Sequence, residues 1–137
     1  MDRLFLDANV LFSAAYREEA PLGALWRNPR VELITSAYAL AEAERHLDAA
    51  QRGRLEALML DVRVVFDVPS AELPEGVELR VKDVPILAAA IAAGATHLIT
   101  GDRRDFGPHF GEKLGGVLVL PPRDYLVSAP RRGSRRP

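Results

Sequence analysis

The stretch THLITGDRRDFG, residues 96–107, joins an apolar run to a turn that contains two aspartates and two arginines. An apolar run of this kind is typical of a buried strand, and the polar residues after it mark its carboxyl end. Taken alone, Asp102 and Asp105 are interpreted as caps of the short helix that follows. In an open parallel sheet, however, ligands bind beyond the carboxyl ends of the strands. The meaning of this turn therefore depends on what the other strands place beside it.

Four other β-like runs alternate with helical patterns along the chain. Strands are predicted at 4–7, 31–35, 62–68, 96–100 and 116–120, and helices at 21–28, 36–50, 51–60 and 84–95. This alternation predicts an α/β fold, a three-layer α/β/α sandwich around a central, mainly parallel five-stranded sheet. The segment 69–82 is interpreted as a connection within one domain that spans residues 1–127.

Composition restricts the chemistry that the chain can perform. The 137 residues include no cysteine, which excludes disulfides, thiolate nucleophiles and zinc-thiolate sites. The three histidines, His46, His97 and His109, lack the spacing of metal ligands, so a bound metal would rest on oxygen. The sequence shows neither a membrane-spanning run nor a secretory signal, and a cytoplasmic location is expected.

The formal net charge of -1 conceals an uneven distribution. Residues 128–137 carry four of the 18 basic residues and none of the 19 acidic ones. Residues 1–127 therefore hold 14 basic and 19 acidic side chains, a net charge of -5. Because Pro, Gly and Ser interrupt the basic stretch, we interpret it as a disordered tail. Such a tail attracts nucleic acid electrostatically, although a solvated tail without a function explains the basic residues equally well.

Three aspartates fall at the predicted ligand-binding edge of the sheet. Asp7 ends the first strand, Asp102 follows the strand at 96–100, and Asp83 precedes Pro85 at the start of a helix. Each one alone is readily explained as a helix cap. Together, carboxylates gathered at one edge repel each other unless a cation neutralises them. A hard divalent ion such as Mg²⁺ or Mn²⁺ suits oxygen ligands, and such ions commonly serve phosphate chemistry.

These residues occur in an order that resembles a known family. The segments LDANVLFSA, SAYALAEAERHL and KDVPILAAAIAAGATHLITGDRRDFG are similar to those of the PIN-domain nucleases, particularly the small stand-alone proteins that include VapC-type toxins of bacterial toxin-antitoxin pairs. The resemblance extends from residue 4 to about residue 120. Its most specific part is the block from Asp83 to Asp105.

The resemblance implies roles for individual residues. Asp7, Glu42, Asp83 and Asp102 would be the catalytic acids, and Asp7, Asp83, Asp102 and Asp105 would be the metal-site carboxylates. Asn9 and Thr100 would take substrate-side roles and would orient a carboxylate or a metal-bound water. Arg103 and Arg104 would hold flanking phosphates or simply remain solvated. Helical periodicity by itself favours Glu44 over Glu42 as the inward acid, whereas the family pattern favours Glu42, and both stay open.

The activity implied by the resemblance is Mg²⁺- or Mn²⁺-dependent hydrolysis of phosphodiester bonds in single-stranded RNA by an endoribonuclease. Two other interpretations are a catalytically inactive PIN-fold binding module and a phosphatase of the haloacid dehalogenase type. The phosphatase requires a second acid two residues after the first, and position 9 is Asn. An antitoxin partner and a homodimer are left open. The apolar helix at 84–95 would suit a dimer surface or the core equally well.

Overall fold

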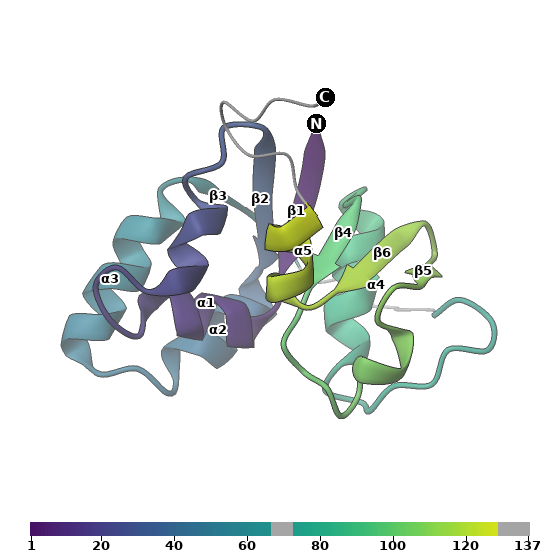
Figure 1. Cartoon of the computed structure of the whole chain (residues 1–137). Helices are drawn as coiled ribbons and strands as arrows, with labels where there is room; N and C mark the ends of the chain where they lie inside the picture. The colour runs from purple at the N-terminus through teal and green to yellow at the C-terminus, as the bar shows by residue number, and fades with distance from the viewer. Residues whose placement is uncertain (67–72, 129–137) are drawn as a thin grey trace, which may run out of the picture.

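The central sheet of the computed structural model has six strands, in the order β3-β2-β1-β4-β6-β5 (Figure 1). The structure describes residues 1–66 and 73–128. The strands are β1 (Asp2–Leu6), β2 (Val31–Ser36), β3 (Val62–Val65), β4 (His97–Ile99), β5 (Lys113–Leu114) and β6 (Val117–Leu120). All neighbouring pairs are parallel except β5 and β6. The predicted α/β fold with a mainly parallel sheet is therefore confirmed.

The sixth strand, β5, was not expected from the sequence. It pairs antiparallel with β6 across a two-residue turn formed by Gly115 and Gly116. Both glycines have positive φ angles, 57° and 86°, as a tight hairpin turn of the primed type requires. The pattern of apolar residues did not reveal a strand this short.

Seven helical segments connect and cover the strands within the described ranges. They are α1 (Ala8–Ala15), η1 (Pro21–Leu25), α2 (Ala37–Glu44), α3 (Ala49–Met59), α4 (Val84–Ala92), η2 (Gly107–His109) and α5 (Pro122–Ser128), where η marks a 3-10 helix.

Two of the helix predictions need correction, and one helix was not predicted. The helix expected at 36–50 ends at Glu44, because Asp48 and Gln51 form a reciprocal capping box that starts α3. The segment at 21–28 forms only the short 3-10 helix η1. Helix α5 was missed, and its last residue, Ser128, had been assigned to the basic tail. Residues 129–137 of that tail, and positions 67–68 of the predicted third strand, lie outside the described residues.

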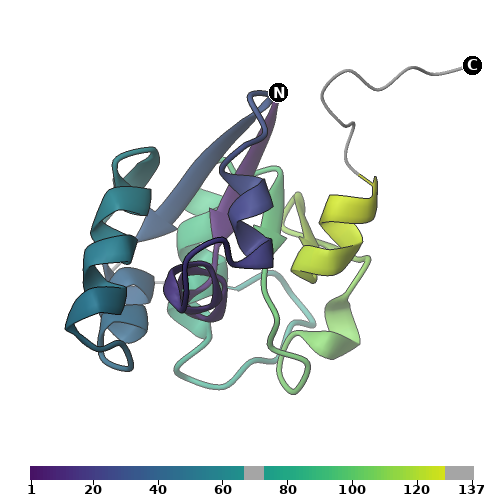
Figure 2. The ribbon, with the colours of Figure 1, turned by 60° about the vertical axis from the view of Figure 1, so that its left-hand side comes forward.

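Side chains alternate along β1 between the two faces of the sheet. Leu4 and Leu6 pack in one apolar cluster with residues of α1, α3 and α5. Phe5 packs in the other cluster, whose helical part comes mainly from α4. The two clusters lie on opposite faces, so helices cover the sheet on both sides (Figures 1 and 2). This arrangement is the predicted three-layer sandwich.

Helix α4 belongs to the core. Residues Ile86 to Ala90 are all buried within the single chain, which explains their apolar character without a dimer. No helix within residues 1–66 and 73–128 is long and apolar enough to cross a membrane.

The topology fixes which loops meet at one edge. Strand β1 lies at the centre of the sheet, between β2 and β4, and both neighbours run parallel to it. The segments that follow these three strands therefore emerge side by side. They contain Asp7 after β1, the start of α2 after β2, and the turn at 100–106 after β4.

Candidate active site

A cavity of about 420 Å³ opens at this edge of the sheet, and four carboxylates line it. They are Asp7, Glu42, Asp83 and Asp102. These acids come from four separate segments: the end of β1, helix α2, the start of α4 and the turn after β4. The structure thus brings together the four residues proposed from the sequence as catalytic acids.

Asp7 is held rigidly by its neighbours. Its Oδ1 accepts a hydrogen bond from the backbone N–H of Ala8 at 2.7 Å, which makes Asp7 the N-cap of α1. Its Oδ2 accepts hydrogen bonds from the Thr100 hydroxyl at 2.8 Å and the Asn9 amide at 3.2 Å. Burial raises the pKa of Asp7, while the bonds from Thr100 and Ala8 oppose that rise. Asp7 therefore caps a helix and also presents a fixed carboxylate to the cavity.

Asn9 and Thr100 join the first strand end to the fourth. The Asn9 Oδ1 accepts a hydrogen bond from the backbone N–H of Gly101 at 2.8 Å. The Thr100 Oγ1 accepts one from the backbone N–H of Asp102 at 3.1 Å. A side chain at position 101 would put its Cβ 3.3 Å from the Asn9 Oδ1, so glycine allows the close approach. Both side chains also donate a hydrogen bond to the Asp7 carboxylate, and their role in the reaction stays a prediction.

Asp102 organises the turn that follows β4. Its Oδ1 accepts hydrogen bonds from the backbone N–H groups of Arg104 at 3.0 Å and Asp105 at 3.1 Å. This is the capping role that aspartate commonly plays at such turns. The capping contacts involve only Oδ1, so the two interpretations of Asp102, turn cap and site carboxylate, are compatible.

The Asp83 carboxyl group is buried and makes fewer hydrogen bonds than its two oxygens could accept. It precedes α4 at the N-cap position, but its side chain makes no capping hydrogen bond. Its side chain is buried, and the Oδ2 has no hydrogen-bond partner among the described residues. Burial, together with the hydrogen bond and the negative charge of Asp105, raises its pKa to about 7. A buried carboxylate oxygen without a donor is costly, and a bound cation would remove that cost.

Asp83, Asp102 and Asp105 form a compact acidic cluster. Each offers a carboxylate oxygen, and the three oxygens lie within 4.8 Å of one another. The hydrogen bond to Asp83 and the positive charge of Arg80 lower the pKa of Asp105. Oxygen ligands at this separation suit Mg²⁺ or Mn²⁺. Asp7 lies outside this cluster of three, although its charge and that of Asp102 interact.

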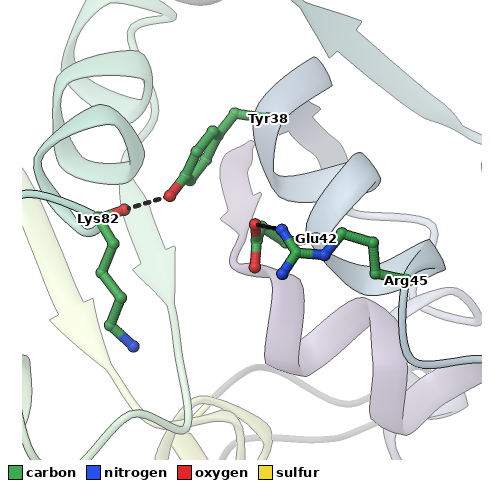
Figure 3. A network of polar contacts seen from close by, with 4 residues as sticks. All are labelled: Tyr38, Glu42, Arg45 and Lys82. Carbon is green, nitrogen blue, oxygen red and sulfur yellow. Dashed lines mark hydrogen bonds and ion pairs between the residues drawn. The ribbon is translucent and has the colours of Figure 1, made fainter.

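Glu42 and Glu44 take different positions on α2. Glu42 is partly buried, lines the cavity and forms an ion pair with Arg45 at 2.7 Å (Figure 3). Glu44 is exposed and does not line this cavity. Periodicity favoured Glu44 because a wheel over 36–48 groups it with Leu40 and Leu47. The buried residues of α2 are instead Ala39 and Ala43, and Leu47 lies beyond the end of the helix at Glu44. The geometry therefore places the glutamate suggested by the family pattern beside the aspartates.

The arginines after Asp102 lie at the margin of the site. Both Arg103 and Arg104 are exposed, and neither lines the cavity that holds the four acids. Arg104 instead lines a second, adjacent cavity together with Asp105 and Arg80. The Arg80 Nε lies 3.2 Å from the Asp105 Oδ1.

Sequence reasoning missed three polar residues that line the acidic cavity. They are Tyr38, His46 and Lys82. Tyr38 donates a hydrogen bond from its hydroxyl to the backbone carbonyl of Lys82 at 2.9 Å, which links α2 to the segment before α4 (Figure 3). Two positional signals were available: Tyr38 follows the end of β2 at the ligand-binding edge, and Lys82 immediately precedes Asp83.

Comparisons with known proteins agree with this geometry. The model of the PIN domain family matches residues 3–104. The chain is similar to VapBC2 from Rickettsia felis, solved bound to a DNA fragment from its promoter, with a TM-score of 0.62 and 15% identity over 87% of this chain and 98% of that one. It is also similar to VapC20 of Mycobacterium tuberculosis, a sarcin-ricin loop cleaving toxin, with a TM-score of 0.50 and 21% identity over 72% and 91% of the two chains. No curated protein matches it. At these identities the two structures demonstrate a shared fold.

Proposed function

This chain belongs to the PIN domain family, and from that premise we propose that it is a metal-dependent endoribonuclease that hydrolyses phosphodiester bonds in single-stranded RNA. The observation that carries the proposal is the acidic cavity, in which Asp7, Glu42, Asp83 and Asp102 converge from separate elements. Membership of this family also removes the reason to consider a haloacid dehalogenase phosphatase.

The residues present fit a divalent cation. Asp83, Asp102 and Asp105 would hold Mg²⁺ or Mn²⁺, because their oxygens cluster within 4.8 Å and the buried Asp83 Oδ2 lacks a donor. Asp7 lines the same cavity and would add to its negative charge. Such an ion, when bound, polarises a phosphoryl oxygen and lowers the pKa of a water molecule enough to yield a nucleophile at neutral pH.

The protein's own groups would orient the reaction. Thr100 and Asn9 fix the Asp7 carboxylate through hydrogen bonds of 2.8 Å and 3.2 Å, so little reorganisation is needed when charge develops. Glu42 faces the same cavity from α2 and offers a carboxylate that can accept a proton from the attacking water. Its ion pair with Arg45 keeps that side chain in place without burying it.

We further propose that the ribonuclease is the toxin of a toxin-antitoxin pair. This role is supported by the similarity of the fold to VapBC2 and VapC20. An antitoxin protein would then be a partner of this chain. Co-expression with the product of a neighbouring gene, followed by purification of a complex that has lost RNA cleavage, would test this role separately.

The catalytic proposal is tested with purified protein, RNA and Mg²⁺, and with the Asp102→Asn variant. Asn retains an Oδ1 that accepts the two backbone hydrogen bonds of the turn, so the fold is expected to survive. We expect cleavage by the wild-type protein that disappears with chelator and falls by at least about a hundredfold in the variant. Equal cleavage under all conditions, or no cleavage of any RNA, would overturn the proposal and favour an inactive binding module.

A further inference from the structure

The acidic cavity also has an aromatic and apolar side. Its lining includes Tyr38 and Phe12, together with three aliphatic residues, Ala8, Ala43 and Ile86. These residues do not contribute to holding a cation. They leave an apolar wall directly beside the acids, in a cavity of about 420 Å³ that is large enough to admit one nucleobase.

Tyr38 presents its ring to this cavity in a fixed position. It lies on α2 one turn before Glu42, so both side chains project from the same face of the helix (Figure 3). Its hydroxyl donates to the Lys82 carbonyl at 2.9 Å. Burial and the negative charges of Glu42 and Asp83 raise the pKa of the Tyr38 hydroxyl, so it remains a neutral donor. A ring restrained in this way loses little conformational entropy when a ligand stacks on it.

Lys82 supplies a positive charge on the same side of the cavity. It is one of only two lysines in the chain, the other being Lys113. Lys82 is exposed, lines the cavity and directly precedes Asp83. Its ammonium group can therefore contact a phosphate that approaches the acids. A cavity that contains both an aromatic ring and a cationic side chain suits single-stranded nucleic acid, because the ring stacks on a base and the cation contacts the backbone.

We propose that the Tyr38 ring is the surface on which the base next to the cleaved phosphodiester stacks, and that Lys82 contacts an adjoining phosphate. This inference rests on the proposed function and adds the recognition of one nucleotide. Stacking requires a base that is not already paired and stacked in a duplex. The same contact would thus provide a physical reason for a preference for single strands, with little dependence on base identity.

The test measures binding of a short, labelled single-stranded RNA by fluorescence anisotropy, with every protein carrying Asp102→Asn to prevent cleavage. The cleaved bond is first mapped with wild-type protein. The base is then removed at each position on either side of that bond, which leaves the sugar-phosphate backbone intact. Variants Tyr38→Ala and Tyr38→Phe are compared with Phe66→Ala, which removes a ring that is 91% exposed and outside the cavity.

We expect Tyr38→Ala to weaken binding of intact RNA by roughly fivefold to a hundredfold. For the one RNA that lacks the stacked base, the same substitution should not weaken binding further. Tyr38→Phe keeps the ring and removes the hydroxyl that donates to the Lys82 carbonyl, so it should bind nearly as well as the parent. Phe66→Ala should change nothing. Loss of binding that is equal for intact and abasic RNA would show that Tyr38 serves only the structure and would overturn the stacking inference.

The lysine contact has its own readout in the salt dependence of binding. Replacing Lys82 by Gln should reduce the slope of log K against log salt by about 0.7, the value for one phosphate contact to a single strand. The matched variant Lys113→Gln should leave the slope unchanged, and equal slopes in all three proteins would refute the contact. If the wild-type protein neither binds nor cleaves RNA, the proposed function itself is overturned. If it cleaves RNA, but removing a base at any position leaves the effect of Tyr38→Ala unchanged, only this inference is overturned.

Discussion

Replacing Asp83 by Asn should stabilise the metal-free protein near neutral and alkaline pH, although it should abolish metal binding. In the folded chain the Asp83 carboxyl is buried and lacks a capping bond, and one of its oxygens has no donor within residues 1–66 and 73–128. Ionisation there is unfavourable, which is why the pKa of Asp83 rises to about 7. Asn has nearly the same shape and carries no charge, so it should avoid this cost. Its amide can also donate to the neighbouring Asp105.

The magnitude follows from the shift in pKa. A rise from 3.8 to about 7 is three pKa units, or about 4 kcal/mol at about 1.4 kcal/mol per unit. This value is an upper limit, because the hydrogen bond between the two acids also lowers the pKa of Asp105. The stabilisation of ionised Asp105 offsets part of the cost of ionising Asp83. We therefore expect Asp83→Asn to gain about 1–3 kcal/mol. For a domain of this size, that gain corresponds to a rise of roughly 3–10 °C in melting temperature.

The sign of the pH dependence is fixed by the direction of the shift. Because the folded pKa lies above the unfolded one, the stability that Asp83 provides is complete below about pH 4 and is lost progressively as the pH rises to about 7. The wild-type protein should therefore lose stability over this range relative to the Asn variant. The difference between the two proteins should be small near pH 4, grow with pH, and level off above about pH 7.

The assay is thermal unfolding followed by circular dichroism, in chelator and in Mg²⁺, across this pH range. Mg²⁺ should raise the melting temperature of the wild-type protein and leave that of the variant nearly unchanged. Asp61→Asn is a suitable control, because Asp61 is exposed in the turn between α3 and β3, and it should shift neither property. A variant that is less stable than wild type in chelator near pH 8, with its secondary structure intact, would refute the reasoning.

Two further predictions concern the same cavity. Glu42→Gln should reduce RNA cleavage by at least about tenfold, whereas Glu44→Gln, at an exposed position, should leave the rate unchanged; the reverse result would assign the role to Glu44. Thr100→Val should lower the free energy of unfolding by about 1–3 kcal/mol, since it removes hydrogen bonds to Asp7 and from the Asp102 backbone, and should also slow cleavage. The matched variant Thr35→Val loses one buried hydrogen bond to a strand carbonyl and should lower stability against denaturant without slowing cleavage. A similar loss of cleavage in Thr35→Val would contradict the role assigned to Thr100.

The alternative of an inactive binding module makes a different set of predictions. It requires no cation, so Mg²⁺ would leave the melting temperature of the wild-type protein unchanged. The buried Asp83 Oδ2 has no partner in the part of the chain that the structure describes, and this argues against the alternative, because a carboxyl group buried there without a ligand is costly. The Mg²⁺ comparison therefore separates the two functions even before an RNA substrate is found.

Local sequence signals anticipated much of the fold and failed where tertiary contacts compete with periodicity. The apolar runs of β1, β2 and β4 are buried on both faces, and their pattern is unambiguous. Helix α2 was predicted too long, because its pattern continues smoothly into the segment where Asp48 and Gln51 begin α3. Strand β5 has two residues and too little pattern to detect. It exists because Gly115 and Gly116 turn the chain back toward β6.

The sequence by itself determined the alternation of the longer strands and helices and the presence of aspartates just after the strands, because burial on both faces and turn chemistry are local properties of the chain. Only the tertiary structure decided which of these acids meet. Crossover connections put β1 between β2 and β4, so that residues far apart in the sequence share one cavity. The same packing left one Asp83 oxygen without a partner and brought Tyr38 and Lys82 to the acids. Burial and proximity of this kind arise from how the elements pack, and no single segment encodes them.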